Sequence, residues 1–414
     1  MLNILINAYA VAPNWGSEPG MAWNWITNIA KYCKCFVITE GEWRNEIEDA
    51  LKTHPQRENI SFYFNPVTDK VRKMCWNQGD WRFYYYYRQW QKSTLKIAEQ
   101  ICCEHKIDIT HQLNMIGFRE PGLLWKIKGV KHVWGPIGSM GEVPVEFLKD
   151  LPLAVRLKQS LKNTITRYQI KHAPVKSAIK NCDALIAALD VTRDQMKKWY
   201  GIDVPVIGET GLVPNEGHPH RGCIGRPIEL LWVGRFIPTK KLSIALEALA
   251  KTTNPKDFHL HIVGSGTDME VALYKQQAVN LGINDICTWY GQILNTEVQK
   301  MMREKDLFFF TSVFEGGPHV ILESIANNIP ILCFDTCGQG VVVDDTIGYK
   351  IPLTNHIEGV NGFAERLNYI SEHREELPIK SSNCTAKQQE LSWESKAKQM
   401  VDIYNKVLPG QTHR

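Results

Sequence analysis

The most informative segment of the chain is LFFFTSVFEGGPHVILESIANNIPIL, residues 307–332. Its apolar run, Leu307–Phe314, predicts a buried strand of a parallel sheet. A glycine pair and Pro318 follow, and proline suits the first position of a helix, where an N–H would have no helical partner. Residues 320–327 then show a helical pattern. A strand that leads through a short turn into a helix is the repeating unit of a doubly wound α/β sheet.

The turn between this strand and helix has the composition of a ligand site. Gly316 and Gly317 permit close backbone approach, and α/β sheets bind ligands where a helix begins at the carboxyl end of a strand. Glu315 lies at the strand end, and Glu323 lies about one turn into the helix, facing the same opening. Carboxylates accept hydrogen bonds from paired hydroxyls, so the two glutamates predict a sugar or a ribose beside a phosphate. Each glutamate alone also has a structural explanation, as a solvated loop residue or as a favourable charge early in a helix.

The strand–EGGPH–helix arrangement, with seven residues between Glu315 and Glu323, resembles the signature of the retaining family-4 glycosyltransferases, the glycosyl transferases group 1. The chain departs from the family in the size of one loop residue and in Asn328, where the family often has glycine. The resemblance implies the GT-B architecture, two Rossmann-like doubly wound domains facing across a cleft. It implies that Glu315 is catalytic and holds the donor sugar, and that Glu323 binds the ribose hydroxyls. The loop residues implied to contact the donor are Gly316, Gly317, Pro318 and His319.

A second motif, LLWVGRFIPTKKLSIALEALA, supplies cations at another strand end. Transfer from a nucleoside diphosphate sugar must neutralise charge that builds on the diphosphate, and without a metal this needs preorganised cations and backbone amides. Arg235 ends the strand and Lys240 precedes the next helix, although loop cations are common on any surface. The segment resembles the diphosphate-binding motif of the family, with Lys241 where a glycine is usual. The resemblance implies that Arg235 and Lys240 hold the two phosphates.

Two further segments of the second half resemble the nucleotide side of the family. VGSGTD (263–268) has two of the three glycines of a dinucleotide-binding motif, which is a weak signal by itself. WYGQILN (289–295) resembles the strand and loop that pack near the base. Gln292 and Ile293 are therefore predicted to contact the base, mainly through their backbone.

The first half carries fewer motifs. The turn Gly16–Gly20 (GSEPG) joins a strand to a helix predicted over 21–32 and resembles a loop that faces the donor, so Gly16 is predicted to bind donor. A plain tight turn is the alternative explanation. His111 is predicted just past a strand end and near the donor sugar, although a lone histidine is more often structural. The family commonly has its histidine two residues later, where Leu113 stands.

The apolar segments predict two doubly wound α/β domains. We expect an N-terminal acceptor-side domain over 1–210, an interdomain connection over 211–227, and a nucleotide-sugar-binding domain over 228–388. Residues 389–414 hold a last helix, 393–407, which in the resembled family returns to the N-terminal domain. Besides the strand that begins at Leu307, the predicted strands are 2–10, 35–39, 60–64, 107–111, 132–135, 184–188, 228–234, 258–264, 286–291, 330–334 and 348–352.

Composition narrows the functional classes. No segment approaches the roughly 20 uninterrupted apolar residues of a membrane helix, and the start of the chain reads as a strand rather than a secretion signal. The eleven cysteines are scattered without a matching pair or histidine cluster, which favours free thiols in a reducing cytosol over zinc. We therefore expect a cytoplasmic protein with no metal and no cofactor besides its donor substrate.

Basic residues gather unevenly despite a net charge of only +4. Residues 151–182 hold seven Lys or Arg and no acid, and residues 71–96 mix cations with a run of aromatic side chains. This pattern fits an anionic membrane surface and fits equally a solvated helix face over an aromatic core. No recognition module supports nucleic acid as the partner.

The sequence therefore predicts a retaining hexosyltransferase that uses a nucleoside diphosphate sugar, with UDP favoured over GDP. The expected acceptor is a glycan or a lipid-linked glycan, in surface polysaccharide biosynthesis, with peripheral membrane attachment if the basic and aromatic residues bind lipid. Retention follows in this reading from attack on the face that the diphosphate leaves, and Glu315 as a covalent nucleophile is the less favoured route. The alternatives are a nucleotide-sugar epimerase of related fold and a non-catalytic nucleotide-sugar-binding scaffold.

Overall fold

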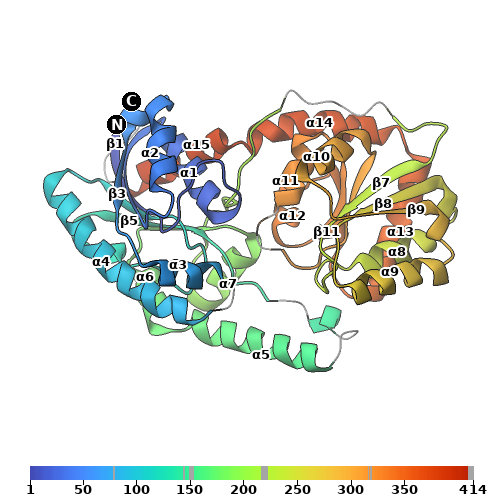
Figure 1. Cartoon of the computed structure of the whole chain (residues 1–414), viewed down its shortest axis with the longest axis horizontal. Coiled ribbons are helices and arrows are strands. Elements are labelled where there is room, and N and C mark those ends of the chain that lie inside the picture. Colours follow the sequence, from blue (N-terminus) through green and yellow to red (C-terminus); the bar gives the residue numbers. More distant parts are fainter. Residues whose placement is uncertain are drawn as a thin grey trace. The chain divides into compact units, whose positions relative to one another are not determined.

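The chain folds into two compact units (Figure 1). The computed structural model describes residues 1–77, 80–142, 145–148, 153–215, 222–315, 317 and 319–408. Unit 1 consists of Met1–Gly141, Thr164–Gly211 and Trp393–Arg414, and unit 2 consists of Glu142–Asn163 and Leu212–Ser392.

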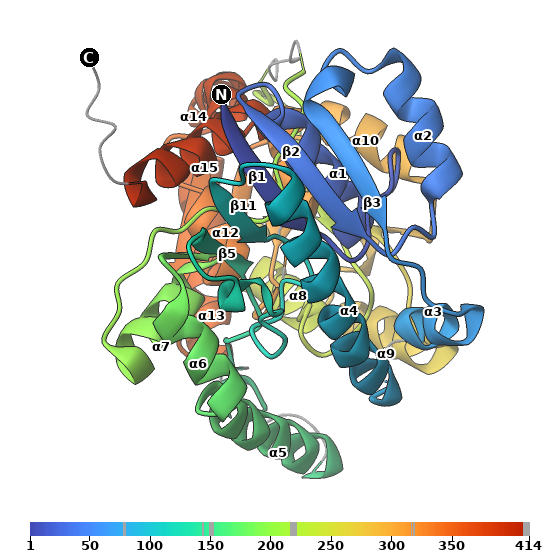
Figure 2. The same cartoon turned by 90° about the vertical axis from the view of Figure 1, so that its left-hand side faces the viewer.

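Unit 1 is built on a parallel sheet with the strand order β3-β2-β1-β4-β5-β6. Figure 2 shows β1, β2 and β3 side by side, and the register pairs Ile4 of β1 with Cys35 of β2 and with Ile109 of β4. Because the chain runs from β1 outward to β3 and then returns to β4, the winding direction reverses between β1 and β4, where open α/β sheets bind ligands. The strands are β1 Leu2–Asn7, β2 Cys33–Thr39, β3 Ile60–Phe64, β4 Ile109–Gln112, β5 Lys131–Ile137 and β6 Ala184–Ala187.

The helices of unit 1 cover its sheet, and the last helix of the chain is among them. Trp393 at the start of this helix packs edge-on against Trp25, with ring centroids 5.9 Å apart. Glu394 accepts from Lys31 Nζ at 3.0 Å. The helices with residues in unit 1 are α1 Ser17–Ile29, α2 Arg44–Thr53, α3 Asp69–Trp76, α4 Arg82–Glu104, α5 Leu153–Ile170, α6 Ala173–Asn181, α7 Asp190–Tyr200 and α15 Trp393–Val407.

Unit 2 repeats the same topology, with the strand order β12-β11-β10-β7-β8-β9. Here the winding direction reverses between β7 and β10, which are neighbouring parallel strands. The strands are β7 Ile228–Val233, β8 Phe258–Val263, β9 Cys287–Gly291, β10 Leu307–Phe310, β11 Ile331–Asp335 and β12 Gly348–Pro352. The helices are α8 Leu242–Ala250, α9 Asp268–Asn280, α10 Asn295–Glu304, α11 His319–Ala326, α12 Cys337–Val342, α13 His356–Glu372 and α14 Glu376–Glu390.

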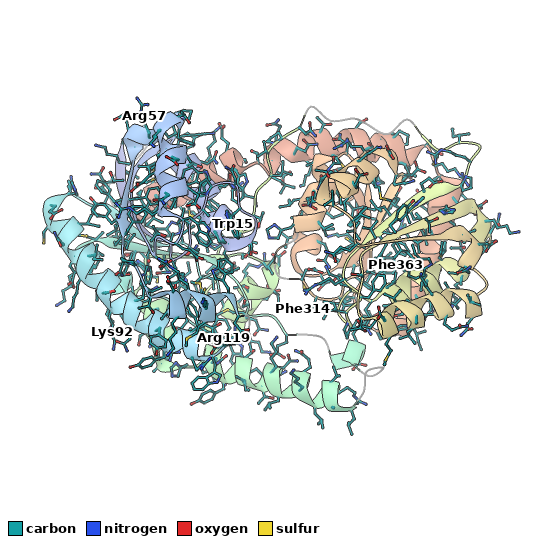
Figure 3. The ribbon with its side chains drawn as sticks, in the orientation of Figure 1. Trp15, Arg57, Lys92, Arg119, Phe314 and Phe363 are labelled. Atoms are coloured by element: carbon teal, nitrogen blue, oxygen red, sulfur yellow. The ribbon has the colours of Figure 1, made fainter. Side chains whose placement is uncertain are left out.

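Aromatic side chains fill the core of unit 2 on one face of its sheet. Phe363 of α13 packs edge-on against Phe309 and Phe334, with ring centroids 5.3 and 4.6 Å apart (Figure 3). All three side chains are fully buried. Burying a phenylalanine contributes on the order of 2 kcal/mol, so this contact ties the strand that carries Glu315 to the helix behind it.

Each strand predicted from apolar runs is present in the described residues, because a run buried on both faces is a strong strand signal in a parallel sheet. The boundaries differ in two instructive places. β10 ends at Phe310 and not at Phe314, since Thr311 and Ser312 bend into hydrogen bonds with the loop after β7. The first helix begins at Ser17 rather than Met21, so Glu18 and Pro19 belong to its first turn.

Candidate functional site

The centre of the candidate site in unit 2 is an ion pair between the ends of β7 and β10. Lys240 Nζ lies 2.5 Å from Glu315 Oε1, and each side chain is 16% exposed. Ser312 Oγ donates to the same carboxylate oxygen at 2.5 Å. The pair therefore forms where the winding direction reverses, with a cation and an acceptor both accessible at the position where such sheets bind ligands.

A network of hydrogen bonds fixes the two loops that carry this pair. Thr311 Oγ1 lies 3.0 Å from the Lys240 carbonyl and 2.9 Å from the Lys241 carbonyl. Trp232 Nε1 donates to the same hydroxyl at 3.0 Å. Lys241 adopts a left-handed backbone with φ of 48° as α8 begins, and only 5% of it is exposed. Of the two neighbouring lysines, Lys240 is therefore the one whose side chain reaches Glu315 at the candidate site.

Arg235 lies on the same loop and is exposed. Within the described residues its guanidinium has no carboxylate partner. Its donors are thus free to bind an anion, and an arginine fork suits phosphate oxygens in a bidentate arrangement.

Of the four residues of the predicted donor loop, the structure describes Gly317 and His319. His319 is the first residue of α11, and loss of solvation lowers the pKa of its imidazole, while the charge of Glu315 opposes that shift. Gly317 is half-buried. The predicted contacts of Gly316 and Pro318 lie outside the described residues.

Glu323 lies on α11 with a different set of neighbours from Glu315. Its Oε1 accepts from Asn295 Nδ2 of α10 at 3.4 Å. Burial raises the pKa of this carboxyl, and hydrogen bonds from Asn295 and Gln299 oppose the shift. A half-buried carboxylate whose neighbours are amides keeps acceptor capacity for hydroxyl donors. The structure therefore separates the environments of the two glutamates that the sequence paired.

The loop after β9 and the glycine motif after β8 differ in what they can offer a ligand. Gln292 is exposed, whereas the Ile293 side chain packs against the apolar cluster that contains Phe308 and Phe310 of β10.

In the glycine motif after β8, Gly264 has φ of +130°, and a Cβ there would lie 1.8 Å from the Gly234 carbonyl oxygen. Close packing of two loop backbones thus explains Gly264 without a dinucleotide.

In unit 1, a carboxyl pair lies near the point where the winding direction reverses. Glu18 of α1 accepts from the Ile116 backbone N–H at 2.8 Å, on the segment that follows β4. Burial raises its pKa. Burial also raises the pKa of Glu209 to about 7, with the charge of Glu18 adding to the shift and Lys396 opposing it. The effect of Glu18 on the pKa of Glu209 indicates that the two carboxyls lie close enough to interact electrostatically.

Gly16 immediately precedes α1 with an ordinary extended backbone, φ of −83°. It is exposed, and no atom would lie within 4 Å of a Cβ built at this position. Neither backbone strain nor packing within the chain therefore requires glycine here, so the position is open for a ligand to approach.

A pocket of about 330 Å³ lies beside Glu18 and combines acids with aromatic rings. Glu42 accepts from Trp76 Nε1 at 3.0 Å, and Trp15 packs against Trp43 with ring centroids 5.2 Å apart. The buried Tyr9 hydroxyl at this pocket has no hydrogen-bond partner among the described residues. Sugar rings suit such a surface, because carboxylates accept their hydroxyls and aromatic faces pack against their C–H groups.

Sequence reasoning missed this pocket, and also Glu209. The segment EGEW (40–43) follows β2 directly, so a systematic inspection of strand ends would have found its two glutamates. Glu209 lay at the edge of the predicted interdomain connection. No local signal there showed that it would meet Glu18.

His111 has an environment that corrects its predicted role. It lies inside β4 rather than past its end and is fully buried. Its Nε2 is 2.7 Å from the Gly135 carbonyl, and its Nδ1 is 2.6 Å from the Tyr404 hydroxyl of α15. Burial lowers its pKa to about 4. With both ring nitrogens bonded inside the protein, His111 anchors α15 to the sheet instead of contacting a sugar.

Two properties of the described part of the chain bear on cofactors and membranes. Nowhere in it do three or more His, Cys, Asp or Glu side chains gather closely enough to hold a metal ion. None of its helices combines the length and the apolar character needed to cross a membrane.

Comparison with known proteins connects unit 2 to a family. Residues 221–380 match the family described as Glycosyl transferases group 1. The lipopolysaccharide 1,6-galactosyltransferase of Salmonella typhimurium (strain LT2) is 32% identical over 179 residues, which are 42% of this chain and 45% of that protein. The matched region therefore spans about half the length of this relative.

Solved structures resemble nearly the whole chain. The lipopolysaccharide outer core galactosyltransferase WaaB in its apo form has a TM-score of 0.59 at 18% identity, over 97% of this chain and 99% of that chain. Anabaena Alr3699/HepE in complex with UDP and glucose has a TM-score of 0.55 at 13% identity, over 97% and 99%. Such likeness concerns the fold, and it confirms the predicted two-domain α/β fold of the GT-B type. Residues 221–380, which match the family described as Glycosyl transferases group 1, hold Lys240, Glu315 and Glu323.

Proposed function

We propose that the protein is a retaining glycosyltransferase of family 4 that moves a hexose from a nucleoside diphosphate sugar to a glycan or lipid-linked acceptor. We further propose that it acts in surface polysaccharide biosynthesis in the cytoplasm. The observation that carries the proposal is the Lys240–Glu315 ion pair at the reversal point of unit 2, inside the segment that matches the family. The Salmonella relative, a lipopolysaccharide galactosyltransferase, supports the choice of pathway.

The donor would bind along the strand ends of unit 2. Arg235 and Lys240 would hold the diphosphate, since charge-assisted hydrogen bonds to phosphate are among the strongest that side chains make. Glu323 would accept from the ribose hydroxyls, and Gln292 and Ile293 would meet the base through their backbone. The Anabaena protein was solved with UDP and glucose, which favours UDP as the nucleotide. Glu315 and the loop Gly316, Gly317, Pro318 and His319 would contact the donor sugar.

For the reaction, Lys240 must exchange its present partner, Glu315, for the departing diphosphate. As the bond between the sugar C1 and the diphosphate oxygen breaks, negative charge builds on that oxygen, and Lys240 and Arg235 stabilise it. The acceptor hydroxyl attacks C1 on the same face and passes its proton to the departing diphosphate, so the configuration is retained. Glu315, relieved of Lys240, accepts hydrogen bonds from the sugar hydroxyls and holds C1 in place.

The acceptor would bind in unit 1. The pocket with Glu18, Glu42, Trp43 and Trp76 presents hydroxyl acceptors beside aromatic faces, and Gly16 leaves the rim beside Glu18 open. Aromatic side chains provide large, rigid contact areas with polar edges. A neutral sugar ring rich in hydroxyls matches this lining.

Helix α5 favours a membrane surface as a further partner. Leu153, Leu157, Leu161, Ile165 and Tyr168 recur at helical spacing, and each is between 45% and 73% exposed. The helix packs on the protein through a different face, with Asn163, Thr166 and Ile170 buried. Its apolar stripe thus points to solvent, flanked by basic residues without any acid, as in helices that lie in anionic lipid interfaces. In residues 71–96 the aromatic side chains divide between core and surface, with Phe83, Tyr87 and Trp90 buried.

We expect nucleotide binding to depend on Glu323 and Arg235. UDP should raise the melting temperature of the wild-type protein more than GDP or ADP, because a ligand that binds only the native state stabilises it. Glu323→Ala and Arg235→Ala should each weaken UDP binding by roughly tenfold or more in calorimetry, the loss expected for one charge-assisted contact. Glu297→Ala and Arg57→Ala, both at exposed positions, are the matched controls. Equal UDP affinity in Glu323→Ala and wild type would remove its assigned role.

Vesicle binding should depend on the apolar stripe of α5. Wild-type protein should pellet with vesicles that contain anionic lipid at low salt, and Leu157→Asn with Leu161→Asn should reduce binding at least about tenfold, since each leucine loses apolar burial. Leu273 and Met269 are equally exposed apolar residues on α9, so changing both to Asn gives the control. Failure of the wild type to pellet would exclude the membrane proposal.

The carboxyl pair of unit 1 should make stability depend on pH. The pKa of Glu209 is raised from 4.5 to about 7 in the folded protein, so the folded state holds this proton more tightly than the unfolded state. Its stabilising contribution is full below about pH 4.5 and is lost as the pH rises through about 7, at most roughly 3 kcal/mol. Glu209→Gln should therefore gain stability relative to wild type between pH 5 and 8 in urea unfolding. A difference that stays constant with pH would show that Glu209 is ionised throughout.

A further inference from the structure

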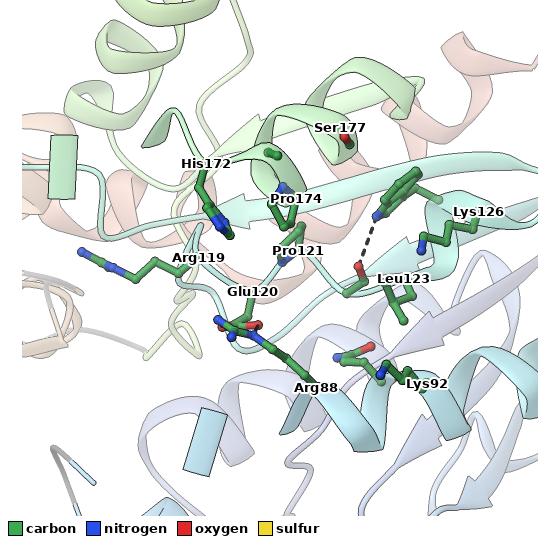
Figure 4. A pocket seen from close by; sticks show the side chains of 14 residues that line it. Arg88, Lys92, Arg119, Glu120, Pro121, Leu123, Lys126, His172, Pro174 and Ser177 are labelled. Carbon is green, nitrogen blue, oxygen red and sulfur yellow. Dashed lines mark hydrogen bonds and ion pairs between the residues drawn. The ribbon is translucent and has the colours of Figure 1, made fainter. Parts of the chain in front are cut away.

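Unit 1 contains a second and larger pocket of about 500 Å³. It lies between α4, the segment 119–126 after β4 and the start of α6. Figure 4 shows basic side chains on different sides of it, with Arg88 and Lys92 of α4 opposite His172 and with Lys126 at one end. The volume falls in the range of small-molecule sites.

The charges of this pocket do not cancel. Arg88 binds the buried Glu120 through two nitrogens, with Nη2 at 2.7 Å and Nε at 3.1 Å from Oε1. Lys92 and Lys126 have no carboxylate partner within the described residues. Glu120, the one acid among the described residues of the lining, is therefore already paired, and two lysines remain for an anion from outside the chain.

Arg119 adds a third cation that has no charged partner among the described residues. Its guanidinium donates to Gln169 Oε1 at 2.5 Å and to Thr166 Oγ1 at 3.0 Å, both of them neutral. Loss of solvation lowers its pKa. A half-buried arginine bonded only to neutral groups is a cation that an incoming anion would stabilise.

Much of the remaining described lining is apolar, beside the polar side chains of Gln91 and Ser177. Pro121, Leu123, Trp125 and Pro174 form walls, and Trp125 Nε1 donates to the Gly122 carbonyl at 3.1 Å, which fixes the indole. The ligand must therefore carry an anionic group beside an apolar or ring-shaped part. Phosphate esters and diphosphate esters have this combination.

The two pockets of unit 1 are adjacent. On α4, Tyr84 lines the acidic pocket and Arg88 lines the basic one, one helical turn apart. Likewise Met115 lines the acidic pocket, and Arg119 follows it by four residues. The same two segments of the chain therefore contribute neighbouring residues to both pockets.

We propose that the basic pocket binds a phosphate or diphosphate group of the acceptor, while the sugar of that acceptor lies in the acidic, aromatic pocket. The inference deepens the proposed function and rests on it, because it assigns the chemical class of the acceptor. The phosphoryl group could be attached to a glycan or to an isoprenoid chain. The binding chemistry of the group is the same in both cases.

The test is calorimetric titration of the full chain with inorganic pyrophosphate, in protein saturated with UDP so that the donor side is occupied. We expect wild type to bind and the double variant Lys92→Ala/Lys126→Ala to bind at least tenfold more weakly. Both lysines are exposed and unpaired in the described residues, so their loss should leave folding intact. The control is Lys96→Ala/Lys128→Ala, which removes the same charge one turn or two residues away.

Two further probes identify the source of the phosphoryl group. Tighter binding of geranyl diphosphate than of pyrophosphate would indicate an isoprenoid-linked acceptor held by Leu123 and Trp125. Tighter binding of glucose 1-phosphate would indicate a phosphorylated glycan. Equal pyrophosphate affinity in the pocket variant and the control, or no binding to wild type, would overturn the inference. Failure of the proposed function would appear separately, as absence of UDP binding in the first step.

Discussion

The structure of the candidate site depends on one ion pair, Lys240 with Glu315. Two half-buried charges remain at that position because each is the other's partner, and removal of one would leave an uncompensated charge. The pair requires β7 and β10 to be neighbours, which the reversal of winding in unit 2 ensures. It also requires the two loops to be held together, as they are by Thr311 and Ser312. A diphosphate would compete with Glu315 for Lys240. The Glu315 carboxylate therefore lies close to the position that a negatively charged phosphate of the donor would take.

The two units share one sheet topology, but the side chains at their reversal points carry opposite charges. In unit 2 the reversal point carries the cations Lys240 and Arg235, which suit an anionic donor. In unit 1 it carries Glu18, and burial raises the pKa of Glu18 and of its neighbour Glu209, with the charge of Glu18 adding to the shift of Glu209. Basic side chains of unit 1 line the other pocket, with Lys92, Arg119 and Lys126. Segregation of this kind allows one chain to bind hydroxyls and phosphates at different places without mutual interference.

The sequence was sufficient for the strands and for the residues at their ends, and insufficient for contacts made across the fold. Apolar runs such as residues 228–234 predicted their strands because burial on both faces leaves a continuous signal. Glu315 and Lys240 could be selected from strand-end positions alone. His111 was misjudged because its partner Tyr404 is 293 residues away. Glu209 was missed for the same physical reason, since its neighbour Glu18 lies on the first helix and nothing local indicates that the two meet.

In the proposed function, Lys240 binds the donor diphosphate and Glu315 holds the donor sugar. The most direct test measures UDP affinity by calorimetry and UDP-sugar turnover in Lys240→Met and Glu315→Gln. Lys240→Met should lose roughly tenfold or more in UDP affinity, whereas Lys256→Met, at an exposed position, should not. Glu315→Gln should bind UDP at least as tightly as wild type, because Lys240 is no longer paired, yet its turnover should fall on the order of 100-fold. Unchanged UDP affinity in Lys240→Met, or full turnover in Glu315→Gln, would contradict the account.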